Sequence, residues 1–250
     1  MAPAMVARLM FAMMALLGFA GPAQAYVMPA DFLMRLLAEA RRESGQKDIT
    51  LTLNADLADH DHQVDERIYL KRPERFRLVQ QDDVTLVRVD KEGQSAAGED
   101  RALKPTGPSQ NLLPVLLMPR GKDLDEMQAR LVKALADLEI DTKTVTFGRL
   151  GETVVYVIGA RAWETDKPQV WLDKMTFMPV RMILPVKTDT KPTLVDTRLL
   201  EYGTGPVPSL PRVVEEWRDG KLARHAEVVS VQLNQELPET LFDLGGGRRR

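Results

Sequence analysis

Along the chain, hydrophobic residues first recur at helical spacing and then alternate with polar ones. Within residues 29–42 they predict one apolar helix face, made of Phe32, Leu33, Leu36, Leu37 and Ala40. Pro29 suits the start of this helix, and Ser44-Gly45 suits its end. From Asp48 the period becomes two, which predicts a half-buried strand whose apolar positions are Ile49, Leu51 and Leu53.

Short extended segments fill the rest of the first half of the chain. Strands are expected over 64–70, 76–80 and 84–89, and the short connections between them indicate an antiparallel meander. The next segment, 91–108, is rich in Gly, Pro, Ser and charge, so it is expected to be a loop or a weak edge strand.

A strongly apolar insertion separates the two groups of strands. Residues 111–119 carry Pro114, which disfavours a regular central strand, so a short apolar helix or lid is expected there. A second helix then begins after Asp123, an N-cap with Glu126 three residues later, and its apolar stripe is Leu124, Met127, Leu131, Leu135 and Leu138. These elements either pack on the sheet to close a core or form a movable cover over an apolar cavity, and the two readings are compatible.

The second half of the chain is almost entirely extended. Strands are expected over 144–150, 152–160, 168–174, 179–187, 193–202, 210–219 and 221–233. Asp219-Gly220 is typical of a tight hairpin turn, and so is the stretch from Arg149 to Glu152. Several strands, among them 154–158 and 228–233, are apolar on both faces, so alternation does not decide which face is buried.

This order of elements predicts a mainly β fold of the α+β class. Strands do not alternate with helices, which argues against a parallel sheet, and a curved antiparallel sheet or incomplete barrel fits best. One domain is expected over 26–244, closed by a short apolar piece at 237–244 and followed by a disordered basic tail at 245–250.

Composition narrows the function classes. The 250 residues are 44% hydrophobic, which is ample for one large core, and the formal net charge of -2 gives no basic excess for nucleic acid. The absence of cysteine excludes disulfides, thiolate metal sites, cysteine nucleophiles and a lipid anchor on an N-terminal cysteine.

The N-terminus is typical of an export signal. Arg8 supplies a positive charge, the apolar run from Leu9 to Ala20 is too short to span a bilayer, and Ala23-Gln24-Ala25 forms a small-x-small cleavage site. Cleavage is expected after Ala25, which would give an exported protein of the bacterial periplasm. An uncleaved membrane anchor is the alternative.

Candidate catalytic and metal-binding residues are sparse. His60 and His62 flank Asp61 in a polar connection, but no further histidine lies near them in the sequence, so we expect an ordinary turn and no metal site. Glu215 and Glu216 are adjacent in a strand and point to opposite faces, so they cannot form a catalytic dyad. With no nucleophile elbow, HExxH motif, phosphate loop or dinucleotide fingerprint, we expect no catalytic residues and no cofactor.

Several motifs together resemble one family. A strand, turn and strand run from Arg67 to Val79 through Lys71-Arg72-Pro73-x-x-Phe76. An apolar strand with Asp follows at 170–174, then Met178-Pro179-Val180-Arg181, and Leu241-Phe242-Asp243 lies near the end. In this order, with the signal peptide, the first helix and the apolar insertion, they resemble the LolA-like periplasmic lipoprotein carriers and lipoprotein-sorting proteins.

The resemblance implies an unclosed antiparallel barrel whose helices cover an apolar hollow. Arg72 matches the family arginine that hydrogen-bonds the lid and holds the empty cavity shut. Phe76 matches an aromatic residue at the cavity mouth, which also implies lipid contacts for Ile68, Leu70 and Leu78. The lid would consist of Leu112, Leu113, Val115, Leu116 and Leu117.

The function implied is that of a monomeric carrier for acyl chains of lipoproteins or a related lipid. It would receive cargo from an inner-membrane release complex and deliver it to an outer-membrane acceptor. The alternative is a LolA-like sensor of lipid or lipoprotein that regulates an envelope-stress partner. Two departures, the long helix over 123–138 and the short chain after Phe242, indicate a divergent member of the family.

Overall fold

The computed structural model forms one antiparallel sheet of twelve strands. It describes residues 27–43, 45–58, 61–72, 75–80, 83–89, 93–95, 115–119, 121–186, 193–204 and 207–242. The strands lie in the order β5-β4-β3-β2-β1-β12-β11-β10-β9-β8-β7-β6, so the first and last strands of the chain pair in the middle of the sheet. The signal-peptide prediction, the tail at 245–250 and His60 lie outside the described residues.

Two groups of consecutive strands make up this sheet. The first group is β1 (Asp48–Leu57), β2 (Val64–Lys71), β3 (Arg75–Gln80), β4 (Asp83–Val89) and β5 (Gly93–Ser95). The second is β6 (Val145–Leu150), β7 (Thr153–Ile158), β8 (Gln169–Asp173), β9 (Pro179–Val186), β10 (Thr193–Leu200), β11 (Val213–Arg218) and β12 (Lys221–Leu233). Within each group, every strand pairs with its neighbours in sequence. β5 and β6 do not pair with each other, and the pairing of β1 with β12 joins the two groups.

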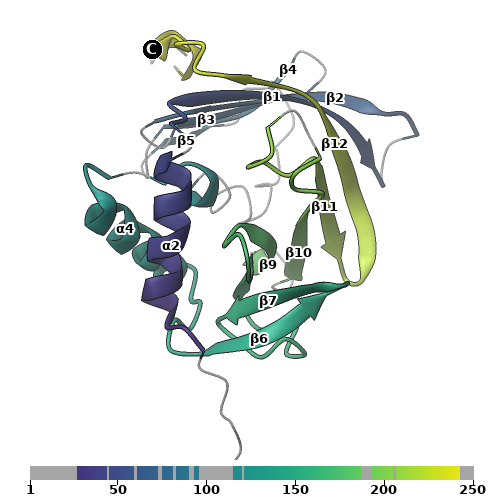
Figure 1. Cartoon of the computed structure of the whole chain (residues 1–250). Helices are drawn as coiled ribbons and strands as arrows, with labels where there is room; N and C mark the ends of the chain where they lie inside the picture. The colour runs from purple at the N-terminus through teal and green to yellow at the C-terminus, as the bar shows by residue number, and fades with distance from the viewer. Residues whose placement is uncertain are drawn as a thin grey trace, which may run out of the picture.

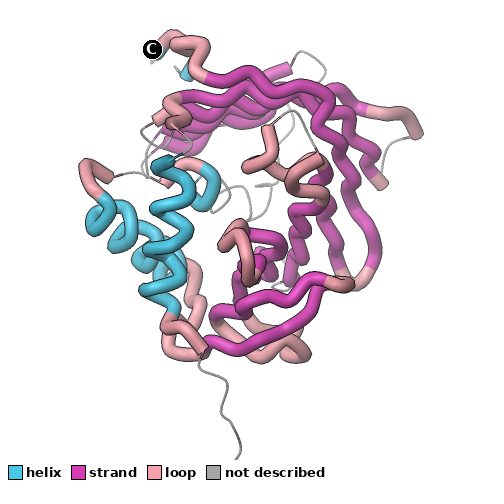
Figure 2. The backbone as a smooth tube through the Cα atoms, viewed as in Figure 1, coloured by secondary structure: helices cyan, strands magenta, loops and turns pink. Residues whose placement is uncertain are grey.

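The sheet curls strongly but does not close, as Figures 1 and 2 show. Its two end strands, β5 and β6, are the termini of the strand order, and helices α2 (Ala30–Glu43) and α4 (Leu124–Asp137) lie over the open, concave side (Figure 1). Register shifts in the β1–β12 and β11–β12 pairs add to the local twist. The predicted unclosed antiparallel fold with helices over its concave face is therefore confirmed.

The turns have the chemistry that the sequence predicted. Asp219 and Gly220 both have positive φ, 49° and 74°, which matches the twist of the two strands they join. Asp123 caps α4, and its carboxylate accepts the backbone N–H of Glu126 at 2.8 Å. The carboxylate of Glu126 accepts the N–H of Lys122 at 2.9 Å, so both residues satisfy donors at the start of α4.

The buried face of α2 is rotated from the predicted one. Leu33 and Leu37 are buried as expected, but Phe32 is 44% exposed, and the rest of the buried face is Ala30, Met34, Ala38 and Arg41. Ion pairing contributes to this orientation, because Arg35 donates to Asp125 of α4 at 2.6 Å. The predicted face omitted Arg41 because a charged side chain is seldom fully buried.

The connection between β10 and β11 also differs from the prediction. A strand was expected from Leu210, but β11 begins only at Val213. Pro208 and Pro211 lack the N–H groups that a sheet ladder needs, and the described residues between β10 and β11, 201–204 and 207–212, form a loop. This loop, here called the inner loop, lies within the curve of the sheet (Figure 1).

The C-terminal residues cover the outer face of β2 and β3. The short 3₁₀ helix η1 (Glu239–Phe242) buries Phe242 completely beside Leu237, with Tyr69 of β2 packed against them. Arg77 donates to the carbonyl of Leu241 at 2.6 Å, and Lys71 donates to the carbonyl of Leu237. The predicted apolar closing piece is thus in place as far as residue 242.

Candidate functional site

Apolar side chains line most of the concave face of the sheet in two clusters. The first joins α2 and α4 to the inner faces of β7 to β11, and includes Leu33, Leu37, Leu131, Leu135, Tyr156, Leu172 and Leu184. The second covers the inner faces of β1, β2, β3 and β12, and includes Ile49, Leu51, Leu53, Leu70, Phe76 and Leu78. The concave face is therefore an apolar hollow, occupied in this structure by side chains of the protein itself.

The lid segment, residues 111–119, is described from residue 115 and spans these two clusters. Residues 115–117 form a single helical turn. Leu116 is fully buried in the first cluster, while Leu117 and Met118 are buried in the second, and Val115 packs against the first. The described part of the segment, residues 115–119, therefore fills the hollow without belonging to a strand. Leu112 and Leu113 lie outside the described residues.

The residues predicted to contact lipid lie on the inner face of β2 and β3. Leu70 pairs with Phe76 across the two strands, and Ile68 pairs with Leu78, so all four share one face. Leu70, Phe76 and Leu78 are buried, Ile68 is partly buried, and all belong to the cluster that contains Leu117 and Met118. The structure thus brings the predicted contact residues and part of the predicted lid together.

Arg72 lies at the end of β2, in the turn toward β3. Its backbone N–H donates to the carbonyl of Lys47 at 3.0 Å, which joins this turn to the start of β1. Burial lowers the pKa of the Arg72 guanidinium, and its Nε is buried without a hydrogen-bond partner. The structure therefore places a partly desolvated donor group in this turn, and its role in holding the lid stays a prediction.

The inner loop is a second insert into the hollow, which the sequence analysis did not anticipate. Its Val207 and Leu210 pack into the second cluster beside the lid segment. The fully buried Arg41 of α2 donates through Nη1 to the carbonyl of Ser209 at 2.6 Å. Gln46 Nε2 adds a hydrogen bond to Ser209 Oγ at 3.2 Å. The C-terminal end of α2 is therefore hydrogen-bonded to the inner loop.

Arg41 and Tyr202 share this buried environment. Burial lowers the pKa of Arg41, and the neighbouring Tyr202 opposes that shift. Burial likewise raises the pKa of Tyr202, whose hydroxyl donates to the carbonyl of Pro179 at 2.7 Å. The spacing of Arg41, four residues after Leu37 and eight after Leu33, is the sequence signal that could have placed it on the buried face.

One region of the concave face is charged. Glu66 of β2 is buried and accepts both Nε and Nη2 of Arg224 from β12, and Gln80 donates to it at 2.9 Å. Burial opposes the charge of Arg224, but the attraction of Glu66 and then of Glu216 outweighs it and raises the pKa of Arg224. These groups satisfy one another, so they tie β12 to β2 and β3 across the intervening strand β1.

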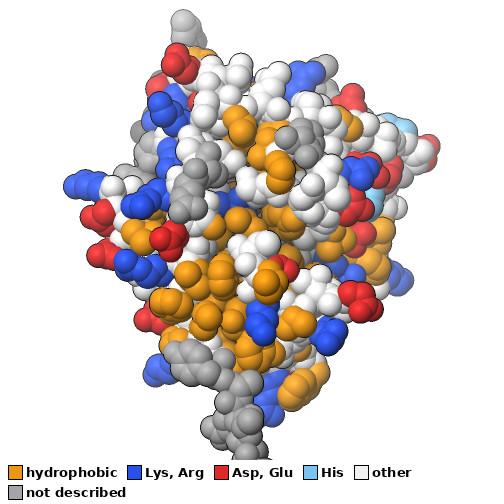
Figure 3. Space-filling model, in the orientation of Figure 1, with side chains coloured by type: hydrophobic (Ala, Val, Ile, Leu, Met, Phe, Trp, Pro, Cys, Tyr) orange, Lys and Arg blue, Asp and Glu red, His pale blue; other side chains and the backbone are white. Residues whose placement is uncertain are grey.

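Apolar surface also reaches the outside at the open side of the sheet. In the orientation of Figure 1, Figure 3 shows hydrophobic side chains gathered over the region of α2, β6 and β7. Val145 and Phe147 of β6 are among the partly buried residues that pack against the first cluster.

The described residues contain no group of His, Cys, Asp or Glu arranged to hold a metal ion. In the same part of the chain, no helix is both long and apolar enough to span a bilayer.

Comparison with known proteins gives matches of structure alone. No protein-family model matches the chain, and no curated protein matches it in sequence. Among solved structures, a LolA superfamily protein from Nitrosomonas europaea matches with a TM-score of 0.45 and 12% identity, over 87% of this chain and 98% of that one. A putative outer-membrane lipoprotein-sorting protein domain from Vibrio parahaemolyticus matches with a TM-score of 0.47 and 10% identity, over 84% and 95%.

A third match is the complex of MucA and MucB from Pseudomonas aeruginosa, with a TM-score of 0.36 and 18% identity. That match covers 86% of this chain but only 61% of the other. The first two matches carry the family name that the sequence motifs resemble. With every TM-score below 0.5, none of the three matches indicates a cargo or a partner for this chain.

Proposed function

We propose that the protein is a periplasmic carrier that binds acyl chains of lipoproteins, or of a related lipid, in the hollow between the sheet and its two helices. The observation that carries this proposal is the burial of the lid segment in both apolar clusters of the hollow. Leu116, Leu117 and Met118 reach both apolar clusters and belong to no strand, so their withdrawal would leave the pairings of the described strands intact.

The energies of the two occupants are comparable. Burying the three lid side chains contributes roughly 1.5–3 kcal/mol each, or roughly 5–9 kcal/mol together. One long acyl chain contributes on the order of 10 kcal/mol on leaving water, at about 0.8 kcal/mol per methylene. The exchange of lid for cargo is therefore close to balanced, which is the condition for loading and release without covalent chemistry. Loading from an inner-membrane complex and delivery to an outer-membrane acceptor belong to this proposal.

Native mass spectrometry of the protein purified from a bacterial periplasm tests binding. We expect a co-purifying lipid or triacylated protein that dissociates when the protein unfolds. An apo mass alone, with no uptake of an added triacylated lipopeptide, would overturn the proposal. Transfer of bound lipopeptide to acceptor vesicles separates a carrier, which releases its cargo, from a sensor, which retains it.

The proposed role of Arg72 is tested by Arg72→Leu. Removing the donor should weaken the closed, empty state and leave more lipopeptide bound after incubation with acceptor vesicles. Arg67→Leu changes an exposed arginine on the same strand and should release cargo like the wild type. Equal release by both variants would remove Arg72 from the mechanism without affecting the assignment of the hollow.

A further inference from the structure

A groove of about 350 Å³ lies on the opposite, outer face of the sheet. It crosses β9, β10 and β11 and is lined by Thr165, Arg181, Ile183, Leu194, Asp196, Arg198, Trp217, Asp219 and Gly220. The strand neighbours of these residues, among them Met182, Leu184 and Leu199, belong to the inner cluster. Because successive side chains of a strand point to opposite faces, the groove is separate from the hollow.

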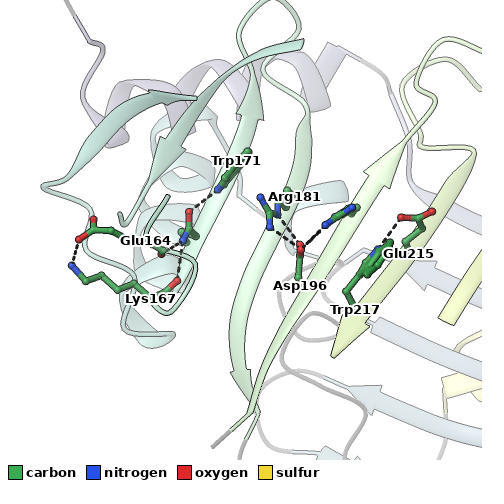
Figure 4. Close-up of polar contacts among 9 residues, drawn as sticks. Glu164, Lys167, Trp171, Arg181, Asp196, Glu215 and Trp217 are labelled. Atoms are coloured by element: carbon green, nitrogen blue, oxygen red, sulfur yellow. Dashed lines mark hydrogen bonds and ion pairs between the residues drawn. The ribbon is translucent and has the colours of Figure 1, made fainter. Parts of the chain in front are cut away.

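A row of stacked and ion-paired side chains, here called the Trp–Arg ladder, runs along the groove, and all of its members line the groove except the buried Trp171. It consists of Trp171, Arg181, Asp196, Arg198 and Trp217, from four successive strands (Figure 4). Arg181 stacks 4.4 Å from the ring centroid of Trp171, and Arg198 stacks 4.5 Å from that of Trp217. Both arginines bind Asp196, Arg181 at 2.7 and 2.8 Å and Arg198 at 3.3 and 3.1 Å.

The ladder leaves hydrogen-bond donors available to a ligand. Each arginine uses Nε and Nη2 for Asp196, and neither Nη1 group makes a hydrogen bond within the described part of the chain. Asp196 accepts from both arginines, so the three charged groups carry one positive charge in excess. Glu215 is turned toward Trp217 Nε1 at 2.9 Å and His225 at 3.4 Å, and Asp219 lies exposed at the rim.

Apolar surface adjoins these donors. Ile183 and Leu194 lie in the groove with the Trp217 ring. Leu222, the cross-strand partner of Trp217, is 41% exposed, and Trp163, in the connection that supplies Thr165, is 73% exposed. Apolar side chains thus lie in the groove and continue on the neighbouring strand at Leu222, over more surface than a small anion covers. Tryptophan and arginine together are the residue types most often found at the energetic centres of protein interfaces.

We propose that this groove docks a segment of a partner polypeptide that carries a carboxylate beside an apolar side chain. The carboxylate accepts from the Nη1 groups of Arg181 and Arg198, and the apolar side chain covers Ile183, Leu194 and Trp217. The ladder fixes both guanidinium groups before binding, so little side-chain conformational freedom is lost on association. The site lies on the face opposite the hollow, so a partner bound there would leave the hollow accessible.

Fluorescence anisotropy with synthetic peptides tests the proposal. The probe is a fluorescein-labelled heptapeptide in which Glu and Leu alternate between terminal glycines, with two control peptides that carry Gln or Lys in place of Glu. We expect the Glu peptide to bind, and the Gln and Lys peptides to bind at least about tenfold more weakly, because a charged hydrogen bond is lost. Equal binding of all three, or displacement of the Glu peptide by equimolar inorganic phosphate, would overturn the proposal.

Variants and a spectroscopic signal locate the binding. Arg198→Gln and Leu194→Glu should each weaken the Glu peptide at least about tenfold. Arg212 pairs with Glu201 and Glu227 away from the groove, and the variant Arg212→Gln should bind the Glu peptide like the wild type.

The chain has three tryptophans, so the Trp217 indole signal can be assigned with Trp217→Phe. Binding that leaves this signal unmoved, or that survives both groove variants in folded protein, would overturn the proposal.

Discussion

At the scale of single residues, Arg41 determines how the hollow is filled. Its guanidinium is fully buried and donates to a backbone carbonyl of the inner loop, so it couples α2 to that loop. A buried arginine is costly to desolvate, and its replacement by an apolar side chain of similar length is often tolerated. Arg41 is therefore expected to fix the position of the inner loop more than it stabilises the whole fold.

Arg41→Met tests this coupling. The unbranched methionine keeps the helix and fills much of the same space, but it cannot bind the carbonyl of Ser209. We expect the midpoint of thermal unfolding to shift by only a few degrees, because the net loss is about 1–2 kcal/mol. Uptake of a fluorescent fatty acid should become several times faster in stopped-flow experiments, since the inner loop opens more readily. Uptake at the wild-type rate would show that the loop does not limit loading.

At the scale of elements, the lid segment and η1 are both attached to the sheet by side chains, not by strand pairing. Such elements can open while the sheet stays folded, because their opening breaks few backbone hydrogen bonds. The attachment of the lid segment to the sheet depends on apolar burial. For η1 it depends partly on charge, since Glu239 pairs with Lys71 at 2.8 Å and with Arg75 at 2.5 Å.

Opening of the lid can be measured with one introduced thiol, because the chain has no cysteine. Leu117→Cys places the thiol in the closed hollow, where Leu117 is 2% exposed, and maleimide labelling should be slow. A triacylated lipopeptide should accelerate this labelling severalfold. Met175→Cys, at a site 83% exposed, and Val157→Cys, at a buried position on the face of β7 that points away from the hollow, provide fast and slow controls that lipid should not change. Lipid protection of Leu117→Cys would contradict displacement of the lid.

Acid should detach η1 before the sheet unfolds. Hydrogen bonding from Lys71, with the charges of Arg75 and Lys71, lowers the pKa of Glu239 from its ordinary value of 4.5. A carboxyl with a lowered folded pKa stabilises η1 fully above pH 4.5, and this contribution is lost as the pH falls through the lowered value. Amide signals of residues 237 and 239–242 should therefore broaden in NMR titrations only as the pH falls below 4.5. Glu239→Gln should show the detached spectrum at neutral pH, and unchanged spectra in both cases would refute the prediction.

At the scale of the whole molecule, the two groups of strands depend on the β1–β12 pair. β12 pairs with β1 along nine positions and with β11 on its other side, so it joins both halves of the sheet. A local defect in β12 should therefore reach strands of both groups, and the protein should unfold as one cooperative unit.

Val228→Asp and Val229→Asp form a matched pair for this prediction. Val228 faces the hollow at 6% exposure, and Val229 faces outward at 51%. A carboxylate at 228 should lower the free energy of unfolding by about 3 kcal/mol or more, whereas one at 229 should change it by about 0.5 kcal/mol or less. Tryptophan fluorescence, which reports Trp171 and Trp217 in the second group, should follow the same transition as circular dichroism. Separate transitions would show that the two halves unfold independently.

The sequence by itself determined the elements and their order. Period-two alternation, the Asp-Gly turn and the Asp123 cap act within a few residues, so all the described strands except β5 and β11 begin within about two residues of their predicted starts. β5 covers only 93–95 of a segment expected to be a loop or a weak edge strand, and the predicted start of β11 at Leu210 became part of the inner loop. The carbonyl of Ser209 in that loop accepts a hydrogen bond from Arg41, which lies 168 residues away in the chain.

Only the tertiary structure decided which faces are buried and which charged residues meet. Strands such as 154–158 are apolar on both faces, and their inner side became definite only when the helices covered it. The Trp–Arg ladder likewise joins side chains from four strands, which are adjacent in space because of strand register. Pairing between distant residues follows from register and curvature, and a local pattern of hydrophobic and polar positions contains neither.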